Sequence, residues 1–206
     1  MIRPRFVQAA VLMMATLSSA APAQAAPTSP VLMLAQASPE TRIREAAGRL
    51  AAYRKLLEGQ DANLRLAALS EMLTSPDAAV RELAFKLGFA SAESEMRSLS
   101  LRQRLINAKL IVLELEREGS ISQQQWEKSI APYGGAKISL ASFSLDPVTG
   151  EMKSGSTQIG RLAGEEIDIR IPNGAVGKMR LGPNATMVGR LSYNAEISHP
   201  VRLVLQ

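Results

Sequence analysis

The 206-residue chain contains no cysteine and only one histidine, His199. The absence of thiols excludes disulfide bonds, thiolate metal sites, cysteine nucleophiles and a lipid-modified N-terminal cysteine. A lone histidine gives a metal site or a histidine-based catalytic pair no second member of its own type. We therefore expect no metal site, no cofactor and no catalytic residue. His199, beside Pro200, is expected to have a structural or surface role on an edge strand.

Aromatic residues are also scarce, with one tryptophan, three tyrosines and four phenylalanines. The 24 basic and 19 acidic side chains give a formal net charge of +5, and they are spread without a long run of one sign. A nucleic-acid-binding surface needs clustered basic residues, and often aromatic residues that stack on bases. The sequence therefore predicts no nucleic-acid partner.

The first 25 residues have the pattern of a secretory signal peptide. Arg3 and Arg5 precede an apolar stretch, and Ala23-Gln24-Ala25 forms a small-x-small cleavage site. An uncleaved membrane anchor is the less favoured alternative, because the apolar run is shorter than the roughly 20 residues of a membrane-spanning helix. We expect a periplasmic or secreted protein of the bacterial envelope, with no stable membrane anchor after cleavage.

Residues 26–39 are rich in proline, alanine and serine, and we expect them to form a flexible tether. A second small-x-small site at 35–37 leaves cleavage after residue 25 or after residue 37 open. No disulfide holds the mature chain together, so its stability must come from the burial of an ordinary core. A chain of this length is sufficient for that.

A phrase then recurs at a fixed interval along the chain. It reads DANLRLAALSEMLTS from Asp61, DAAVRELAFKLGFAS from Asp77 and, less regularly, ESEMRSLSLRQRLIN from Glu93. Such a period predicts stacked helices between residues 40 and 105, arranged as four short helices or two hairpins. Asp61 and Asp77 stand where a helix N-cap belongs, and the Ser-Pro pair at 75–76 is expected to end a helix.

The pattern D-x-x-[VL]-R-x-x-A-[LF] in these units resembles the inner-helix signature of HEAT-like repeats over roughly residues 45–105. This resemblance implies that each helical pair leaves an apolar flank for a neighbour to cover, and about three repeats are normally needed for stability. We expect the last helix to pack against the C-terminal domain or against a partner.

Arg65, Arg81 and Arg97 occupy the same position in successive units. One hypothesis is a structural ladder in which each arginine pairs with an aspartate such as Asp61 or Asp77. The alternative is a concave basic strip that binds an acidic partner. The ladder is favoured, because the aspartates repeat with the same period.

Residues 106–206 predict an antiparallel β domain, either a sandwich or a small barrel. Residues 109–116 favour a strand but are also compatible with a continued helix, and Ser122 with Gln125 predicts a capped helix near 122–130. The alternation of residues 137–145 changes phase near Ala141, and residues 146–150 are typical of a turn. The expected strands after this turn are 152–156, 157–162, 166–171, 177–181, 187–193 and 199–205.

Asp146, Glu165, Glu166 and Asp168 are the densest carboxylates of this region. An acid–base pair or a calcium site is conceivable from them, but Asp146 suits a turn, and Glu166 with Asp168 lies on one face of an alternating strand. A solvent-exposed face is the favoured interpretation.

These patterns together predict an α+β protein without enzymatic activity. It would bind an unidentified protein partner through the helical block or its junction with the β domain. The alternative is a carrier of a small apolar ligand inside a closed β domain. A third possibility, a hydrolase, would require Asp146, Glu165 or His199 to converge in a cleft.

Overall fold

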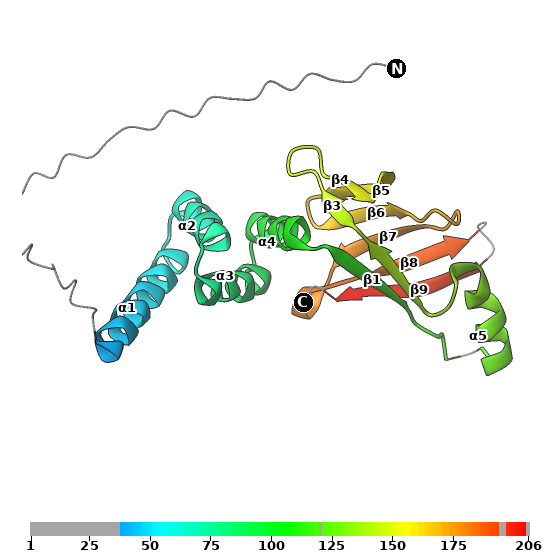
Figure 1. Cartoon of the computed structure of the whole chain (residues 1–206), viewed down its shortest axis with the longest axis horizontal. Coiled ribbons are helices and arrows are strands. Elements are labelled where there is room, and N and C mark those ends of the chain that lie inside the picture. The colour runs from blue at the N-terminus through cyan, green and yellow to red at the C-terminus, as the bar shows by residue number, and fades with distance from the viewer. Residues whose placement is uncertain (1–37, 120, 194–196, 205–206) are drawn as a thin grey trace, which may run out of the picture. The chain divides into compact units, whose positions relative to one another are not determined.

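A computed structural model describes residues 38–119, 121–193 and 197–204. The fold class is α+β, with helices in the N-terminal half and an antiparallel sheet in the C-terminal half (Figure 1). The predicted signal peptide and the predicted tether, apart from residues 38 and 39, lie outside the described residues. Within the described residues, no helix is both long and apolar enough to cross a membrane.

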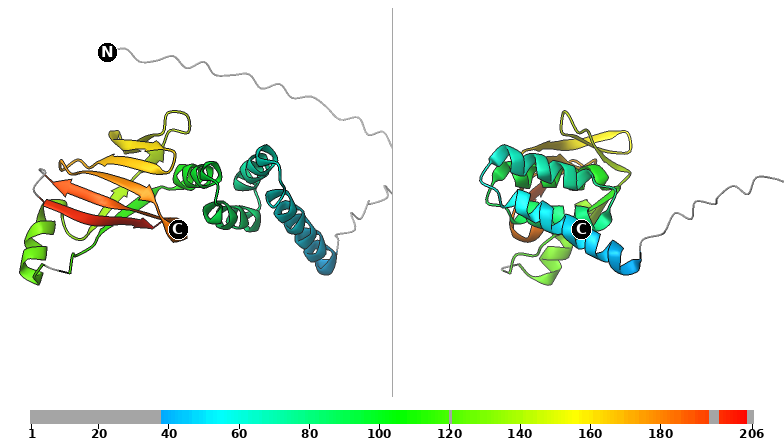
Figure 2. Two further views of the ribbon diagram at one scale, coloured as in Figure 1. Left: turned by 180° about the vertical axis from the view of Figure 1, so that it is seen from behind. Right: turned by 90° about the vertical axis from the view of Figure 1, so that its left-hand side faces the viewer.

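The helical block consists of consecutive helices that pack against their neighbours in the chain (Figures 1 and 2). Pro39 is the first residue of α1, a position that tolerates proline because its missing N–H would have no partner there. The helices are α1 (Pro39–Leu57), α2 (Ala62–Thr74), α3 (Ala78–Ala90) and α4 (Ser94–Asn107).

The predicted N-caps are confirmed. The carboxylate of Asp61 accepts hydrogen bonds from the N–H groups of Asn63 and Leu64, and that of Asp77 accepts one from Ala79. These bonds satisfy first-turn donors that have no partner within the helix. Ser75 then ends α2, as expected of a residue before proline.

The helices share one apolar core, built largely from side chains that recur at equivalent places in the repeated units. Its buried members are Leu57, Ala68, Leu69, Met72, Leu73, Val80, Ala84, Phe85 and Met96. Gly88 of α3 permits a close approach to α4, since a Cβ at this position would overlap the Ser100 hydroxyl oxygen.

Residues 110–115 form a strand, as favoured, and α5 (Gln123–Ile130) begins with the predicted Ser122–Gln125 capping box. Within the described residues the sheet has nine strands, in the order β2-β1-β9-β8-β7-β6-β5-β4-β3, and all its pairings are antiparallel. The strands are β1 (Leu110–Leu115), β2 (Lys137–Ala141), β3 (Phe143–Leu145), β4 (Glu151–Ser154), β5 (Thr157–Ala163), β6 (Glu166–Arg170), β7 (Val176–Leu181), β8 (Thr186–Tyr193) and β9 (Ile197–Val204).

The two outermost strands of the sheet are consecutive in the chain. β2 pairs with β1, β3 pairs with β4, and Ser142 between them has a left-handed φ of 50°. The amide of Phe143 still donates to the carbonyl of Lys109 at 2.9 Å. Because one bent segment provides both edges, the sheet is nearly closed and barrel-like, one of the two architectures that the sequence predicts.

Apolar side chains fill the enclosed face of this sheet. Every strand contributes buried apolar residues, among them Leu113, Ile159, Ile167, Met179 and Leu203. Strong curvature requires close backbone approaches between neighbouring strands. At Gly189 an added Cβ would overlap the carbonyl oxygen of Lys178, so this position excludes any side chain.

Both ends of the sheet are covered by helices, with α4 at one end and α5 at the other (Figure 1). Leu101 and Leu105 of α4 belong to the same apolar core as the strands. Trp126 of α5 and Tyr133, in the short helix η1 (Ala131–Tyr133), belong to it as well. The last helix of the repeat block therefore packs on the sheet, as expected.

The expected edge position of His199 is wrong. β9 lies between β1 and β8, and His199 is buried with 4% of the residue surface exposed. Proline usually marks an edge strand because it lacks an N–H group. Here Pro200 takes part in the sheet through its carbonyl, which accepts a hydrogen bond from the Glu116 amide at 2.9 Å.

Candidate functional site

The repeated arginines have one contact in common. Each guanidinium donates to the carbonyl of the residue six positions earlier, in the turn that precedes its own helix. These bonds run from Arg65 to Gly59 (2.5 Å), from Arg81 to Ser75 (2.7 Å) and from Arg97 to Ser91 (2.8 Å). A cation at this place satisfies carbonyls that the preceding helix leaves without a partner.

Two arginines of the repeat block also face a carboxylate at the N-cap position of a later helix. Arg65 lies 2.7 Å from Glu93, the residue at the cap position of α4, two units later. Arg49 stands in the same relation to Asp77, at 4.0 Å. The links therefore connect alternate helices rather than consecutive ones.

Asp61, by contrast, has no ion pair within the described residues and serves as the cap of its own helix. Arg81 donates a second bond, to the Pro76 carbonyl at 2.9 Å. Only 17% of the Arg65 side chain and 26% of the Arg97 side chain are exposed. Because these cations are tied to backbone and carboxylate partners, we place the candidate binding site elsewhere.

The last arginine of the series connects the repeat block to the sheet. Arg97 lies 2.7 Å from Glu165, in the turn between β5 and β6. Only 9% of the Glu165 side chain is exposed, and its backbone carbonyl accepts a bond from Leu181. The sheet turn thus provides the acidic group that a further helical unit would otherwise provide.

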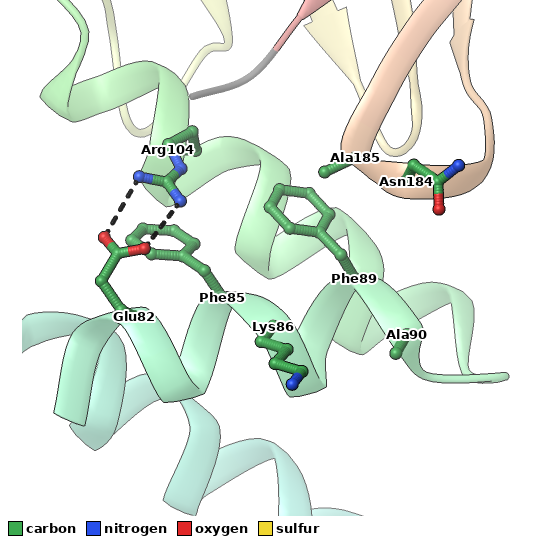
Figure 3. A pocket seen from close by; sticks show the side chains of 8 residues that line it. All are labelled: Glu82, Phe85, Lys86, Phe89, Ala90, Arg104, Asn184 and Ala185. Carbon is green, nitrogen blue, oxygen red and sulfur yellow. Dashed lines mark hydrogen bonds and ion pairs between the residues drawn. The ribbon is translucent and has the colours of Figure 1, made fainter. Parts of the chain in front are cut away.

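A cleft opens at this junction between α3, α4 and the short helix η2 (Pro183–Ala185), which precedes β8 (Figure 3). Its volume is about 430 Å³, within the usual range for small-ligand sites. The residues that line it are Glu82, Phe85, Lys86, Phe89, Ala90, Arg104, Asn184 and Ala185.

The wall of the cleft is a stack of aromatic and cationic groups. The guanidinium carbon of Arg104 lies 3.8 Å from the centre of the Phe85 ring, and the Phe85 and Phe89 rings stack with 6.2 Å between their centres. Arg104 also faces both carboxylate oxygens of Glu82, at 3.4 Å each (Figure 3). Its Nε is buried and has no hydrogen-bond partner. The charge of Arg104 is therefore already matched by Glu82.

Lys86 differs from Arg104 because it is exposed and has no carboxylate partner within the described residues. Since Glu82 neutralises Arg104, the cleft retains the positive charge of Lys86. An apolar wall beside one free cation suits an apolar group that lies next to a carboxylate.

The loop side of the cleft has an unusual backbone. Asn184 and Ala185 follow one another with left-handed φ values of 57° and 54°. Asparagine tolerates this region, but for alanine it costs about 1–2 kcal/mol. Ala185 nevertheless lies beside Phe89 (Figure 3). Backbone strain of this kind tends to occur at functional sites. It therefore supports the cleft as the candidate binding site.

The carboxylates considered for catalysis do not assemble. Glu166 and Asp168 are exposed on the outer face of β6, and Asp146 accepts bonds from the Val148 and Thr149 amides. These amides, Thr149 first, hold the pKa of Asp146 below its usual range. Within the described residues, no three His, Asp or Glu side chains are grouped so as to hold a metal ion.

His199 lies among aromatic rings beneath α5. Its ring meets Trp126 edge-on with 5.0 Å between ring centres, and Tyr133 lies 6.0 Å away. Burial lowers the pKa of His199, while the Ser129 carbonyl and the charge of Glu118 act in the opposite direction. Its Nε2 is buried without a partner. The hydroxyl of Tyr133 donates to the Leu191 carbonyl at 3.3 Å.

Sequence reasoning did not identify the cleft residues as a site. One signal was present, because Arg104 occupies the position that Met72 and Gly88 hold in the two preceding units. Met72 is fully buried, so an arginine in an apolar position of the repeat was a visible irregularity. The contribution of Asn184 and Ala185 had no such signal.

We compared the chain with protein-family models, curated proteins and solved structures, and found no match.

Proposed function

We propose that the protein is a non-enzymatic binding protein of the bacterial envelope that holds a partner protein in the cleft between α3, α4 and η2. The observation that supports this most is the composition of the cleft. Aromatic side chains, a neutralised arginine and one free lysine line it within the part of the chain that the structure describes. Such a surface offers binding energy and orientation rather than a nucleophile or a general base.

The chemistry of the partner follows from these groups. Phe85 and Phe89 favour contact with an apolar side chain. Lys86 favours a carboxylate within a few ångströms of that side chain. The proposed ligand is therefore an exposed segment of a partner protein in which an apolar residue lies next to an acidic one.

The repeat architecture supports a role in protein binding. Helical stacks of the HEAT type, which the units resemble, offer extended surfaces of this kind. Export is proposed from the N-terminal sequence alone, since residues 1–25 lie outside the described residues. A cytoplasmic location of the processed protein would contradict this part of the proposal.

The alternative proposal, a carrier of an apolar ligand, requires space inside the sheet. Buried side chains such as Ile159, Ile167 and Met179 converge there instead. This observation favours the cleft over the interior of the sheet as the binding site.

Site-specific photo-crosslinking in cells is the direct test. A photoreactive residue at Ala90, on the wall of the cleft, is expected to give one discrete adduct with a partner protein. The same residue at Lys178, exposed on the outer face of β7, is the matched control and should give none.

A charge reversal identifies the contribution of Lys86. Lys86→Glu is expected to lower the yield of the Ala90 adduct about tenfold, the effect of losing about 1.4 kcal/mol. Lys128→Glu, at an exposed position on α5, should leave the yield unchanged. Equal adducts at Ala90 and Lys178, or no effect of Lys86→Glu, would refute a binding role for the cleft.

A further inference from the structure

The N-terminal end of the helical block, formed by α1 and α2, exposes an apolar position that is buried in the later units. Leu64, Val80 and Met96 occupy the same place in consecutive units. Val80 and Met96 are each 4% exposed, whereas Leu64 is 48% exposed. In the later units this position belongs to the apolar core of the helical block, and among the described residues Leu64 does not.

The carboxylates of the cap positions show the same difference. Asp77 faces Arg49, and Glu93 faces Arg65. In each pair the arginine lies two repeat units earlier in the chain than the carboxylate. Asp61 has no ion pair within the described residues. The arginine that would pair with Asp61 in the same way falls at position 33, which is Met33. Residues 6–41 contain no lysine or arginine. Residues 6–41 therefore cannot supply the missing cation.

The same end carries the complementary groups on α1. Arg42, Arg54 and Lys55 are exposed and have no carboxylate partner within the described residues. Ile43 is 68% exposed and Leu56 is 38% exposed. The end of the block formed by α1 and α2 thus carries an unmatched carboxylate and an exposed apolar side chain on α2, and unmatched cations and exposed apolar side chains on α1, all within the described part of the chain.

We propose that this end is the contact between two copies of the chain. A pair of helices that carries both halves of a complementary pair suits an isologous contact, in which each copy provides the group that the other copy lacks. In such a dimer α1 of one copy covers Leu64 of the other, and a cation of that α1 faces Asp61. The proposal is independent of the cleft, because none of these residues lines it.

Sedimentation equilibrium of the purified protein tests the proposal, with a reversible dimer as the expected result. Leu64→Glu should yield monomers, and Asp61→Asn should raise the dimer dissociation constant at least tenfold. Asparagine keeps the helix cap while it removes the charge. Circular dichroism establishes that both variants remain folded.

Two controls match these changes. Val188→Glu replaces an apolar residue of similar exposure, 46%, on the outer face of β8. Glu71→Gln removes an exposed charge elsewhere on α2. Both should dimerise like the wild type. The proposal is overturned if the wild-type protein stays monomeric up to about 1 mM, where millimolar contacts are detected. It is also overturned if the control variants weaken the dimer as much as the test variants do.

Discussion

Arg97 of α4 lies 2.7 Å from the carboxylate of Glu165, and its other terminal nitrogen lies 2.8 Å from the carbonyl of Ser91. A single guanidinium thus joins the turn between α3 and α4 to the turn between β5 and β6. The carboxylate is the more buried partner, with 9% of its side chain exposed. Removal of the arginine would therefore leave a nearly buried charge without compensation.

Arg97→Met is expected to lower the free energy of unfolding by about 2–4 kcal/mol, because an unpaired buried charge is costly. The double variant Arg97→Met/Glu165→Gln should lose less than the sum of the single variants. Urea denaturation of all four proteins measures the coupling. The exposed pair Lys178–Asp168, at 3.6 Å, is the control and should show a coupling of about 0–1 kcal/mol.

The contact between Gly88 and Ser100 predicts opposite effects at the two positions. Gly88→Ala should lower the free energy of unfolding by about 1–3 kcal/mol, since its Cβ would overlap the Ser100 hydroxyl. Ser100→Ala should raise that free energy by about 1 kcal/mol, because the buried hydroxyl has no partner. It should also reduce the loss caused by Gly88→Ala.

The control for Gly88→Ala is Gly48→Ala in α1, where an added Cβ meets nothing within 4 Å. This change should raise the free energy of unfolding by about 0.5–1 kcal/mol through helix propensity alone. Equal responses at Gly48 and Gly88 would contradict the close approach of α3 and α4. Thermal melts of the variants provide the measurement.

Ala185 of η2 has a left-handed φ, so we expect that glycine at this position would stabilise the protein. Ala185→Gly should remove strain of about 1–2 kcal/mol, less about 0.5–1 kcal/mol of backbone entropy. A net gain of about 0.5–1 kcal/mol in unfolding free energy is therefore expected from chemical denaturation. Ala163→Gly in β5, where the alanine φ is not positive, should instead destabilise the protein. A loss at position 185 as large as that at 163 would refute the strain.

Because His199 is buried, we expect the free energy of unfolding to fall in mild acid. Burial lowers its folded-state pKa below the ordinary value of 6.5, so the unfolded chain binds more protons between the two values. Stability therefore rises with pH in that window and falls as the pH drops below about 6.5, by at most about 1.4 kcal/mol per pH unit. The charge of Glu118 raises the pKa of His199 and that of Arg190 lowers it, so the two partly offset each other.

Urea denaturation between pH 5 and 8 measures this dependence, and His199→Phe should flatten it. NMR titration of the ring reports the histidine pKa without overlap, because the chain has no other histidine. A folded-state pKa at or above 6.5 would contradict the effect of burial.

The local features of the fold could be predicted from the sequence. The caps Asp61 and Asp77 follow from the chemistry of the first helical turn. The bounds of β5 through β8 follow from alternation and turn residues. Each of these depends on neighbours within a few positions, so a single sequence contains the information.

The candidate site could not be predicted in the same way. Phe89 and Ala185 meet only because η2 lies against α3, and no local pattern specifies such a contact. Pro200 suggested an edge strand because most prolines in sheets lie there. β1, far earlier in the chain, pairs with β9 and makes that position internal. Non-local pairing was the missing information in both cases.

The bend at Ser142 has a consequence for strand alignment. Because β2 and β3 belong to one continuous segment, a slip of β2 along β1 would carry β3 along β4 by the same amount. In an open sheet an outer hairpin can shift by itself, whereas here a shift on one side must disturb the pairing on the other. Alternative alignments are thereby penalised twice, and this stretch of backbone fixes the register of both strand pairs, β1 with β2 and β3 with β4.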